Sequence, residues 1–258
     1  MEQVTQTRDL QDFTRIDLRA AGAIDLTQGR DFSFTMTSDE ALHELIETVI
    51  EGDTLIIKFV EDTQKIKSGN DIRYTITMPL IAGVRISGGG SLHCGNIAGK
   101  SFALDLPGGS SIHIQSIAVA DFRLRVQGGS KLTLGHIQAA RIHMDIPGSA
   151  NMIIADLSAN DLTIGIRGTI NLSIAGRVMT QTINVVGVAN IKAEHLQSNQ
   201  ATVKSLGIGN VDLWVTDTLD VVVSGAGSVK YYGDPSVKKS MSGIGRVQKI
   251  GDTPVPIV

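Results

Sequence analysis

Four residues of alternating charge recur at a constant spacing and could carry out chemistry together. Arg85, Asp105, Arg125 and Asp145 follow one another at equal intervals of about 20 residues, a period typical of stacked repeats. If a repeat of that length stacks, their side chains form one row. Two carboxylates in such a row could bind Ca²⁺ or act as general acid and base on a polysaccharide. A solvated ladder, in which alternating signs avoid like-charge contacts, is the interpretation that we favour.

A second pair of residues extends this candidate binding surface. Arg123 and His143 each stand two residues before a member of the row, so in extended chain they point to the same side. Arg125 would occupy the space between the two carboxylates, where substrate and water must sit, and would hold both carboxylates ionised. We therefore expect no catalytic residue and no cofactor on this surface. Its candidate ligand-binding residues are Arg85, Asp105, Arg123, Arg125, His143 and Asp145.

Four asparagines share another position of the repeat. They are Asn151, Asn171, Asn190 and Asn210. Stacked amides can hydrogen-bond from one repeat to the next. The spacing therefore predicts a structural ladder, and ligand binding at the surface is the less favoured alternative.

Two histidines and the single cysteine could suggest a metal site. His93 and His113 are separated by the same interval, so stacking would bring their imidazoles close together, but Thr133 follows in the same row. Two ligands do not complete a zinc site, which needs three or four. Cys94 falls in an apolar column of the repeat, which predicts a buried, unreactive thiol. We expect no metal.

A small group of aromatic residues stands near the C-terminal end. Trp214, Tyr231 and Tyr232 lie in two successive repeats of a chain in which aromatics make up only 4%. They are candidates for a ligand-binding patch, although packing against the core is the simpler interpretation.

The composition excludes several classes of protein. The chain has 258 residues, 42% of them hydrophobic, and a formal net charge of −3, with no basic run typical of nucleic-acid binding. No apolar stretch reaches the roughly 18 residues that a transmembrane helix needs. The polar segment Met1 to Leu10 lacks the apolar core of a signal peptide. This indicates either a cytoplasmic protein or a mature chain with a replaced start.

A glycine-centred repeat positions all of these side chains. Its anchors, whose numbers differ successively by 20, 20, 20, 20, 19, 20, 18 and 18, are Gly88, Gly108, Gly128, Gly148, Gly168, Gly187, Gly207, Gly225 and Gly243. Four residues after each anchor the chain is always apolar, and apolar residues also dominate two and four residues before it. Alternation of apolar and polar positions predicts strands with one buried face. A single repeat cannot bury that face alone, so the repeats must stack.

The predicted fold is therefore all-β, a right-handed parallel β-helix with coils of about 20 residues. A left-handed hexapeptide solenoid is disfavoured because most steps are longer than three hexapeptides and no six-residue sub-period is visible. In the last copy, Lys239 and Lys249 occupy columns that are apolar elsewhere, as expected of a terminal coil.

Residues 1–80 lack the clear repeat and predict an irregular N-terminal cap. Strands are expected over 13–18, 23–27, 32–36, 54–60 and 74–78, with a polar loop over 63–71. Ser38 is the expected cap of a short helix, because Leu42, Leu45, Ile46 and Val49 would share one helical face. We predict one continuous domain: cap and first coils at 1–80, β-helix at 81–250 and a tail at 251–258.

Several segments, taken as a set, resemble one known family. They are Arg8-Asp-Leu-Gln-Asp-Phe-Thr-Arg-Ile, Gly52-Asp-Thr-Leu-Ile-Ile, Met78-Pro-Leu-Ile-Ala-Gly-Val, Ser87-Gly-Gly-Gly-Ser-Leu, Ser224-Gly-Ala-Gly-Ser-Val-Lys-Tyr-Tyr-Gly and Ser242-Gly-Ile-Gly-Arg-Val. The family is known as "putative auto-transporter adhesin, head GIN domain". The resemblance covers nearly the whole chain, although the middle repeats depart from Ser-Gly-x-Gly at Gly168 and Gly187.

The resemblance implies a right-handed parallel β-helix exported to the bacterial cell envelope, either the periplasm or the outer-membrane surface, or secreted. It brings no catalytic motif. We expect a non-catalytic role in adhesion or in binding a glycan or another cell-surface ligand. A polysaccharide lyase or hydrolase and a self-assembling structural solenoid, hence a homo-oligomer, are the alternatives.

Overall fold

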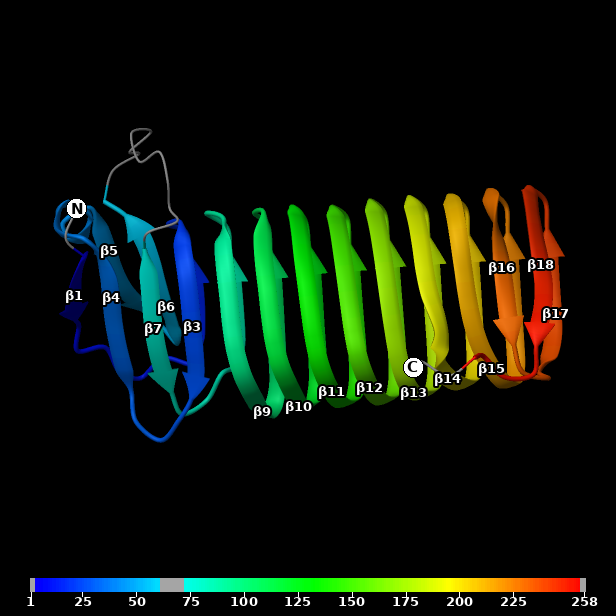
Figure 1. The fold of residues 1–258 in the computed structure, drawn as a ribbon, viewed down its shortest axis with the longest axis horizontal. Coiled ribbons are helices and arrows are strands. Elements are labelled where there is room, and N and C mark those ends of the chain that lie inside the picture. Colours follow the sequence, from blue (N-terminus) through cyan, green and yellow to red (C-terminus); the bar gives the residue numbers. More distant parts are fainter. Residues whose placement is uncertain (1–2, 61–71, 256–258) are drawn as a thin grey trace.

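The chain folds into an elongated parallel β-helix, seen in a computed structural model that describes residues 3–60 and 72–255 (Figure 1). Each of seven long strands makes most of one coil: β9 (Gly90–Leu106), β10 (Ser110–Val126), β11 (Gly129–Ile146), β12 (Ser149–Ile166), β13 (Thr169–Val185), β14 (Val188–Ser205) and β15 (Ile208–Val223). The C-terminal coils consist of shorter strands: β16 (Ala226–Tyr232), β17 (Ser236–Met241) and β18 (Ile244–Gly251). The chain winds in a right-handed sense as it advances from the N-terminal to the C-terminal end (Figure 1).

The register confirms the repeat that the glycines predict. Ser110 of β10 pairs in parallel with Gly90 of β9 on one side and with Ser130 of β11 on the other, so both steps match the spacing of the anchors. The shorter step to β14 arises where β13 lacks one residue, and the register shifts between Ile154 and Leu157 of the neighbouring β12. Variation in repeat length is thus absorbed within the coils while the stack continues.

Each coil has three faces, which β10 illustrates. Face 1 is Ser110–Ile114, face 2 is Ile117–Val119 and face 3 is Phe122–Val126, and the equivalent residues of other coils carry the same names. Buried and solvated residues alternate within a face, and the alternation breaks between faces, where two neighbouring side chains both lack full burial. Side chains outside each face therefore form straight rows along the molecule.

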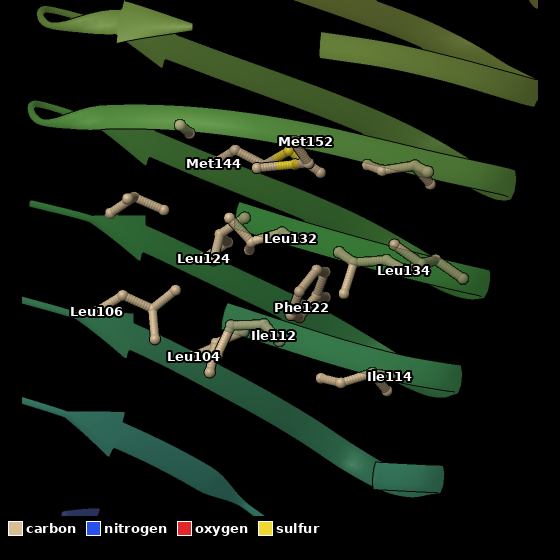
Figure 2. Packing of buried hydrophobic residues seen from close by; sticks show 14 of the residues in the cluster. Leu104, Leu106, Ile112, Ile114, Phe122, Leu124, Leu132, Leu134, Met144 and Met152 are labelled. Atoms are coloured by element: carbon tan, nitrogen blue, oxygen red, sulfur yellow. The ribbon is translucent and has the colours of Figure 1, made fainter. Parts of the chain in front are cut away.

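The interior is an aliphatic column, as the composition predicts. Side chains from opposite faces meet in the middle of the coil, among them Leu104, Ile112 and Leu132 (Figure 2). Phe102 and Phe122 stack one coil apart, with ring centroids at 5.7 Å and planes 3° apart. The column continues until the last coil, where Met241 is 40% exposed and the predicted apolar position is no longer covered.

The anchor glycines are required by a close approach of the backbone. A Cβ atom on Gly128 would lie 2.2 Å from the carbonyl oxygen of Gly108. Neither residue has a positive φ among the described backbone conformations. The repeat therefore selects glycine because coils touch at this corner, and not because the corner needs a left-handed conformation.

The N-terminal region is built from short strands and one helical turn. These are β1 (Gln3–Thr7), β2 (Arg15–Leu18), β3 (Gly22–Gln28), β4 (Ser33–Asp39), α1 (Glu40–His43), β5 (Ile46–Glu51), β6 (Thr54–Phe59), β7 (Arg73–Met78) and β8 (Gly83–Ile86). The expected strands are present, although their ends differ slightly from the prediction. The short helix is also present, but its predicted extent is wrong: Ile46 and Val49 lie in β5. Asp39 rather than Ser38 precedes the helix, and no side-chain cap is formed.

The first coil of the chain is not the first coil of the stack. β2 pairs in parallel with β6 on one side and with β8 on the other, and β3 likewise lies between β7 and β9. The segment β2–β3 is thus inserted between two coils that follow it in sequence. Beyond it, β5 pairs antiparallel with β6, β4 with β7 and β1 with β4, and these strands form the N-terminal end of the stack.

Two sequence expectations fall wholly or partly outside the described residues. They are the loop over 63–71 and the last three positions of the tail over 251–258. In the described part of the chain, no helix is both long and apolar enough to cross a membrane.

Candidate functional site

The charged row predicted from the repeat spacing lies on face 3. In register, Arg85 is adjacent to Asp105, Asp105 to Arg125, and Arg125 to Asp145. The inserted strand β2 adds Asp17 on the far side of Arg85. The row therefore contains five charges of alternating sign. Asp17, the first residue of this row, could not be predicted from the spacing, because β2 does not belong to the sequential repeat.

Arginines partner every carboxylate in this row. Arg85 forms an ion pair with Asp105 and lies 3.9 Å from Asp17, measured between Nε and Oδ1. Asp145 lies 3.7 Å from Arg125 Nε and accepts hydrogen bonds from Arg167 at 2.8 and 3.0 Å. Each carboxylate of the row is thus already engaged by a guanidinium group. The geometry suits recognition rather than proton transfer.

A second alternating row, missed in the sequence, runs beside the first at the edge of face 3. Asp121, Arg141 and Asp161 are adjacent in register. Arg141 donates hydrogen bonds of 2.7 and 3.0 Å to the two oxygens of Asp121. Thr180 donates one of 2.6 Å to Asp161. These residues have the same spacing as the row that was found, so that signal would have identified them.

Arg123 and His143, the candidates beside the first row, lie between the two rows. They are adjacent in register and line an open depression of about 530 Å³ together with Asp121, Arg141 and Asp161. A neighbouring depression of about 500 Å³ brings two further positive side chains, Arg15 and Lys100, to this surface. It is lined by Arg15, Ala82, Lys100, Ser101, Phe102, Ala103, Asp121, Arg123 and Arg141.

Positive charge is in excess around Asp121. A hydrogen bond from Arg141 lowers the pKa of this carboxyl group, and the charges of Arg141, Arg123 and Lys100 lower it further. With Lys100 included, three fixed positive charges face two carboxylates, Asp121 and Asp161, across the two depressions. Arg15, which also lines the second depression, forms an ion pair with Asp53. This part of face 3 is therefore suited to a ligand that carries negative charge.

The asparagine row lies on face 1, but the predicted continuous ladder is not formed. Asn171 donates a hydrogen bond of 3.0 Å to Asn151. In the described part of the chain, no side-chain hydrogen bond joins Asn171 to Asn190 or Asn190 to Asn210, and all four residues are exposed. Asn210 instead accepts a hydrogen bond from Ser228. Water can satisfy exposed amides, so nothing compels them to bond one another.

His93 and Cys94 lie on opposite sides of the β9 backbone, and His113 occupies the position equivalent to His93 in β10. The rings of His93 and His113 are 5.6 Å apart, centroid to centroid, in an edge-to-face arrangement. Across residues 3–60 and 72–255, no three His, Cys, Asp or Glu side chains gather closely enough to hold a metal ion. Cys94 is 5% exposed, and burial raises the pKa of its thiol to about 12.

The aromatic residues do not form a single exposed patch. Trp214 and Tyr232 are adjacent in register and half-buried on the outside of face 2, whereas Tyr231 packs against the hydrophobic core. Between described residues, Trp214 has no ring-to-ring contact. Two of the three aromatic candidates therefore remain available at the surface.

Face 1 also carries a pair of acidic residues that the sequence reasoning did not single out. Asp212 Oδ1 and Glu194 Oε2 are buried oxygens without a hydrogen-bond partner in the described structure. Burial raises the pKa of Asp212; the charge of Glu194 adds to this rise, and Lys230 opposes it. Glu194 belongs to a stretch of β14 with extra residues between Ala193 and Gln197, where the register shifts. An irregular insertion of this kind has no periodic signal in the sequence.

Comparison with solved structures shows the same architecture. A putative adhesin from Parabacteroides distasonis superposes with a TM-score of 0.72 at 19% identity over 96% of this chain and 97% of that one. A putative lipid binding protein from the same species gives 0.63 at 20% identity over 96% of each chain. A putative adhesin from Parabacteroides merdae gives 0.57 at 19%, also over 96% of each. At these identities the likeness concerns the fold.

Sequence comparison identifies the family directly. No curated protein matches the chain significantly. One family model matches residues 12–169 and again 134–235, which together span most of the chain. The chain therefore belongs to the family described as "putative auto-transporter adhesin, head GIN domain".

Proposed function

We propose that this protein is a non-catalytic component of the bacterial cell envelope that binds an acidic glycan through face 3. The observation that carries the proposal is the cluster of Arg123, Arg141 and Lys100 around Asp121. Carboxylate or sulfate groups at regular intervals along a polysaccharide would meet arginines at regular intervals along a β-helix. Arginine suits this role because its planar fork binds carboxylates through two hydrogen bonds.

The ligand class follows from the shape and the charge of the surface. The two depressions over face 3 are open and lie side by side, since Asp121, Arg123 and Arg141 line both. A long, flexible and anionic chain fits such a surface better than a compact molecule, which needs an enclosing pocket. The family name supports adhesion, and one structural relative has a lipid-binding name, so a phosphate-bearing lipid is the competing ligand.

A polysaccharide lyase or hydrolase is the alternative on the same face, and the arginine pairing counts against it. Asp105 and Asp145 are two coils apart, about 10 Å, with Arg125 in register between them. An acid and base pair needs room for sugar and water in that gap. Arg125 lies in that gap, with its Nε 3.7 Å from Asp145.

Titration calorimetry with oligogalacturonate at low ionic strength tests the proposal. We expect binding that weakens as salt rises, because the contacts are ionic. Arg123→Gln should lower the affinity at least about 10-fold. Lys131→Gln, which removes a charge from exposed face 1, should leave it unchanged. Maltooligosaccharide of equal length is the neutral control ligand.

Three results would contradict the proposed glycan binding, each in a different way. Equal binding by Arg123→Gln and the wild type would place the ligand elsewhere, and binding to phosphatidylglycerol vesicles but not to the acidic glycan would favour a lipid. Release of new reducing ends from polygalacturonate by the wild type, lost in the double variant Asp105→Asn and Asp145→Asn, would establish the enzymatic alternative in place of this proposal.

A further inference from the structure

The C-terminal end of the β-helix is an uncovered cross-section of its core. β17 and β18 pair with β15 and β16 on one side, and no described strand pairs with their other side. Val237 is 36% exposed and Met241 40%, although both occupy columns that are buried in earlier coils. Ile244 at the corner is 87% exposed. This end presents free backbone groups and apolar side chains, which favour association.

The same end is basic. Residues 236–251 contain four positive side chains and no acidic one: Lys238, Lys239, Arg246 and Lys249. Lys249 is compensated by Asp234 and Asp252 at 3.0 and 2.7 Å. The other three form no ion pair with any described residue, although Asp220 is adjacent to Lys238 in register. Three positive charges therefore remain uncompensated around an apolar surface.

The opposite end is acidic. Residues 39–53 contain six carboxylates and no lysine or arginine: Asp39, Glu40, Glu44, Glu47, Glu51 and Asp53. Lys58 compensates Glu47 at 3.2 Å, and Arg15 compensates Asp53 at 3.4 Å. The other four form no ion pair within the described structure. They lie on and beside β5, whose outer edge has no described partner strand.

Both ends also offer unpaired strand edges. The C-terminal end finishes with β18 on face 1 and β17 on face 3, and no described strand pairs with their outer edges. The N-terminal end finishes with β1 on face 1 and β5 on face 3, which likewise have no described strand beyond them. Backbone groups at one end can therefore pair with those at the opposite end of a second copy.

We propose that the C-terminal end of this protein binds the N-terminal end of a second copy, head to tail. The ends lie at opposite extremes of one axis (Figure 1), so the contact is heterologous and does not close. Charge complementarity orients the encounter, since two C-terminal ends or two N-terminal ends repel each other. The product is a short, salt-sensitive filament of β-helices that share one axis.

Sedimentation velocity at rising protein concentration and low ionic strength tests this inference. The wild type should form species of increasing mass that dissociate at about 0.5 M salt, where the Debye length is a few ångströms. A basic-end variant carries Lys238→Glu, Lys239→Glu and Arg246→Glu. An acidic-end variant carries Glu40→Lys, Glu44→Lys and Glu51→Lys. Each should remain monomeric alone, and an equal mixture of the two should associate again.

The mixing experiment separates an interface from a folding defect, because misfolded variants would not recover by being combined. A third variant carries Lys131→Glu, Arg177→Glu and Lys204→Glu on exposed sites of the middle coils. Its net charge changes by the same amount as that of the basic-end variant, and it should associate like the wild type. A wild type that stays monomeric at every concentration overturns the proposal. So does association that survives both end reversals, or a mixture that stays monomeric.

Discussion

A Cβ atom on Gly168 would lie 1.8 Å from the carbonyl oxygen of Gly148, the equivalent residue one coil earlier. The atom that it meets is backbone and cannot rotate away, so Gly168→Ala must force two coils apart. We expect a loss of at least about 2 kcal/mol in the free energy of unfolding. Gly129→Ala is the matched control, because nothing lies within 4 Å of its Cβ position. Equal denaturation midpoints for the two variants would contradict the close contact.

The apolar column makes a second prediction at Leu132, which is 1% exposed. Leu132→Asp places a carboxylate without a partner in an aliphatic interior and should cost more than about 3 kcal/mol, measured by denaturant unfolding. Lys131→Asp, at the adjacent exposed position, should change stability by less than about 0.5 kcal/mol. A soluble Leu132→Asp protein as stable as the wild type would refute the inward orientation of this column.

The partly buried carboxyl group of Asp212 makes the folded protein less stable at neutral pH than in acid. Burial raises its pKa above the ordinary 3.8, so the folded protein binds this proton more tightly than the unfolded chain. The stabilisation of the folded state by this tighter proton binding is greatest below pH 3.8, and it is lost as pH rises through the pKa that Asp212 has in the folded protein. Asp212→Asn should therefore raise the melting temperature at pH 7 and lose this advantage in acid.

Asp217 supplies the opposite control on the same strand. Hydrogen bonds from Thr216 and Asn199 lower its pKa, so its ionised form stabilises the folded protein above the ordinary pKa and the contribution is lost in acid. Asp217→Asn should lower the melting temperature at pH 7. If both variants shift the melting temperature in the same direction at pH 7, one of the two assignments is wrong.

The exposed asparagine row predicts a small effect. Asn171→Ala removes one surface hydrogen bond to Asn151 and leaves both neighbours in contact with water. The change in unfolding free energy should be below about 0.5 kcal/mol, whereas a buried ladder would lose about 1–3 kcal/mol. A clear drop in the denaturation midpoint would show that the amides are linked more strongly than the single hydrogen bond implies.

The repeat could be predicted from the sequence because it is enforced at every coil by the same physical contacts. An apolar side chain at Leu132 and a glycine at Gly168 satisfy packing conditions that recur along the whole stack. The charged row followed from the same spacing. Because these packing conditions recur in every coil, the same residue types recur in the sequence, and a single sequence is sufficient to detect them.

The structural features that the sequence did not predict have no periodic pattern of residues. The insertion of β2 between β6 and β8 depends on contacts between segments that share no repeat motif. Leu42, Ile46 and Val49 fit one helical face, yet Ile46 and Val49 are used in a strand because β6 offers hydrogen bonds along its edge. Whether Asn171 is buried or exposed also escapes the pattern, since amides occur in both settings.

The insertion of β2–β3 makes the two ends of the molecule respond differently to mechanical load. A pull on the C-terminus meets β18, which is hydrogen-bonded on one side, and can peel the last coil away before the next one is loaded. A pull on the N-terminus first separates β1 from its one partner, β4. It must then draw β2 and β3 out from between two coils, with hydrogen bonds on both sides broken together. Beyond β1, the N-terminal segment is therefore held on both sides at once, whereas the C-terminal coils can separate one strand at a time.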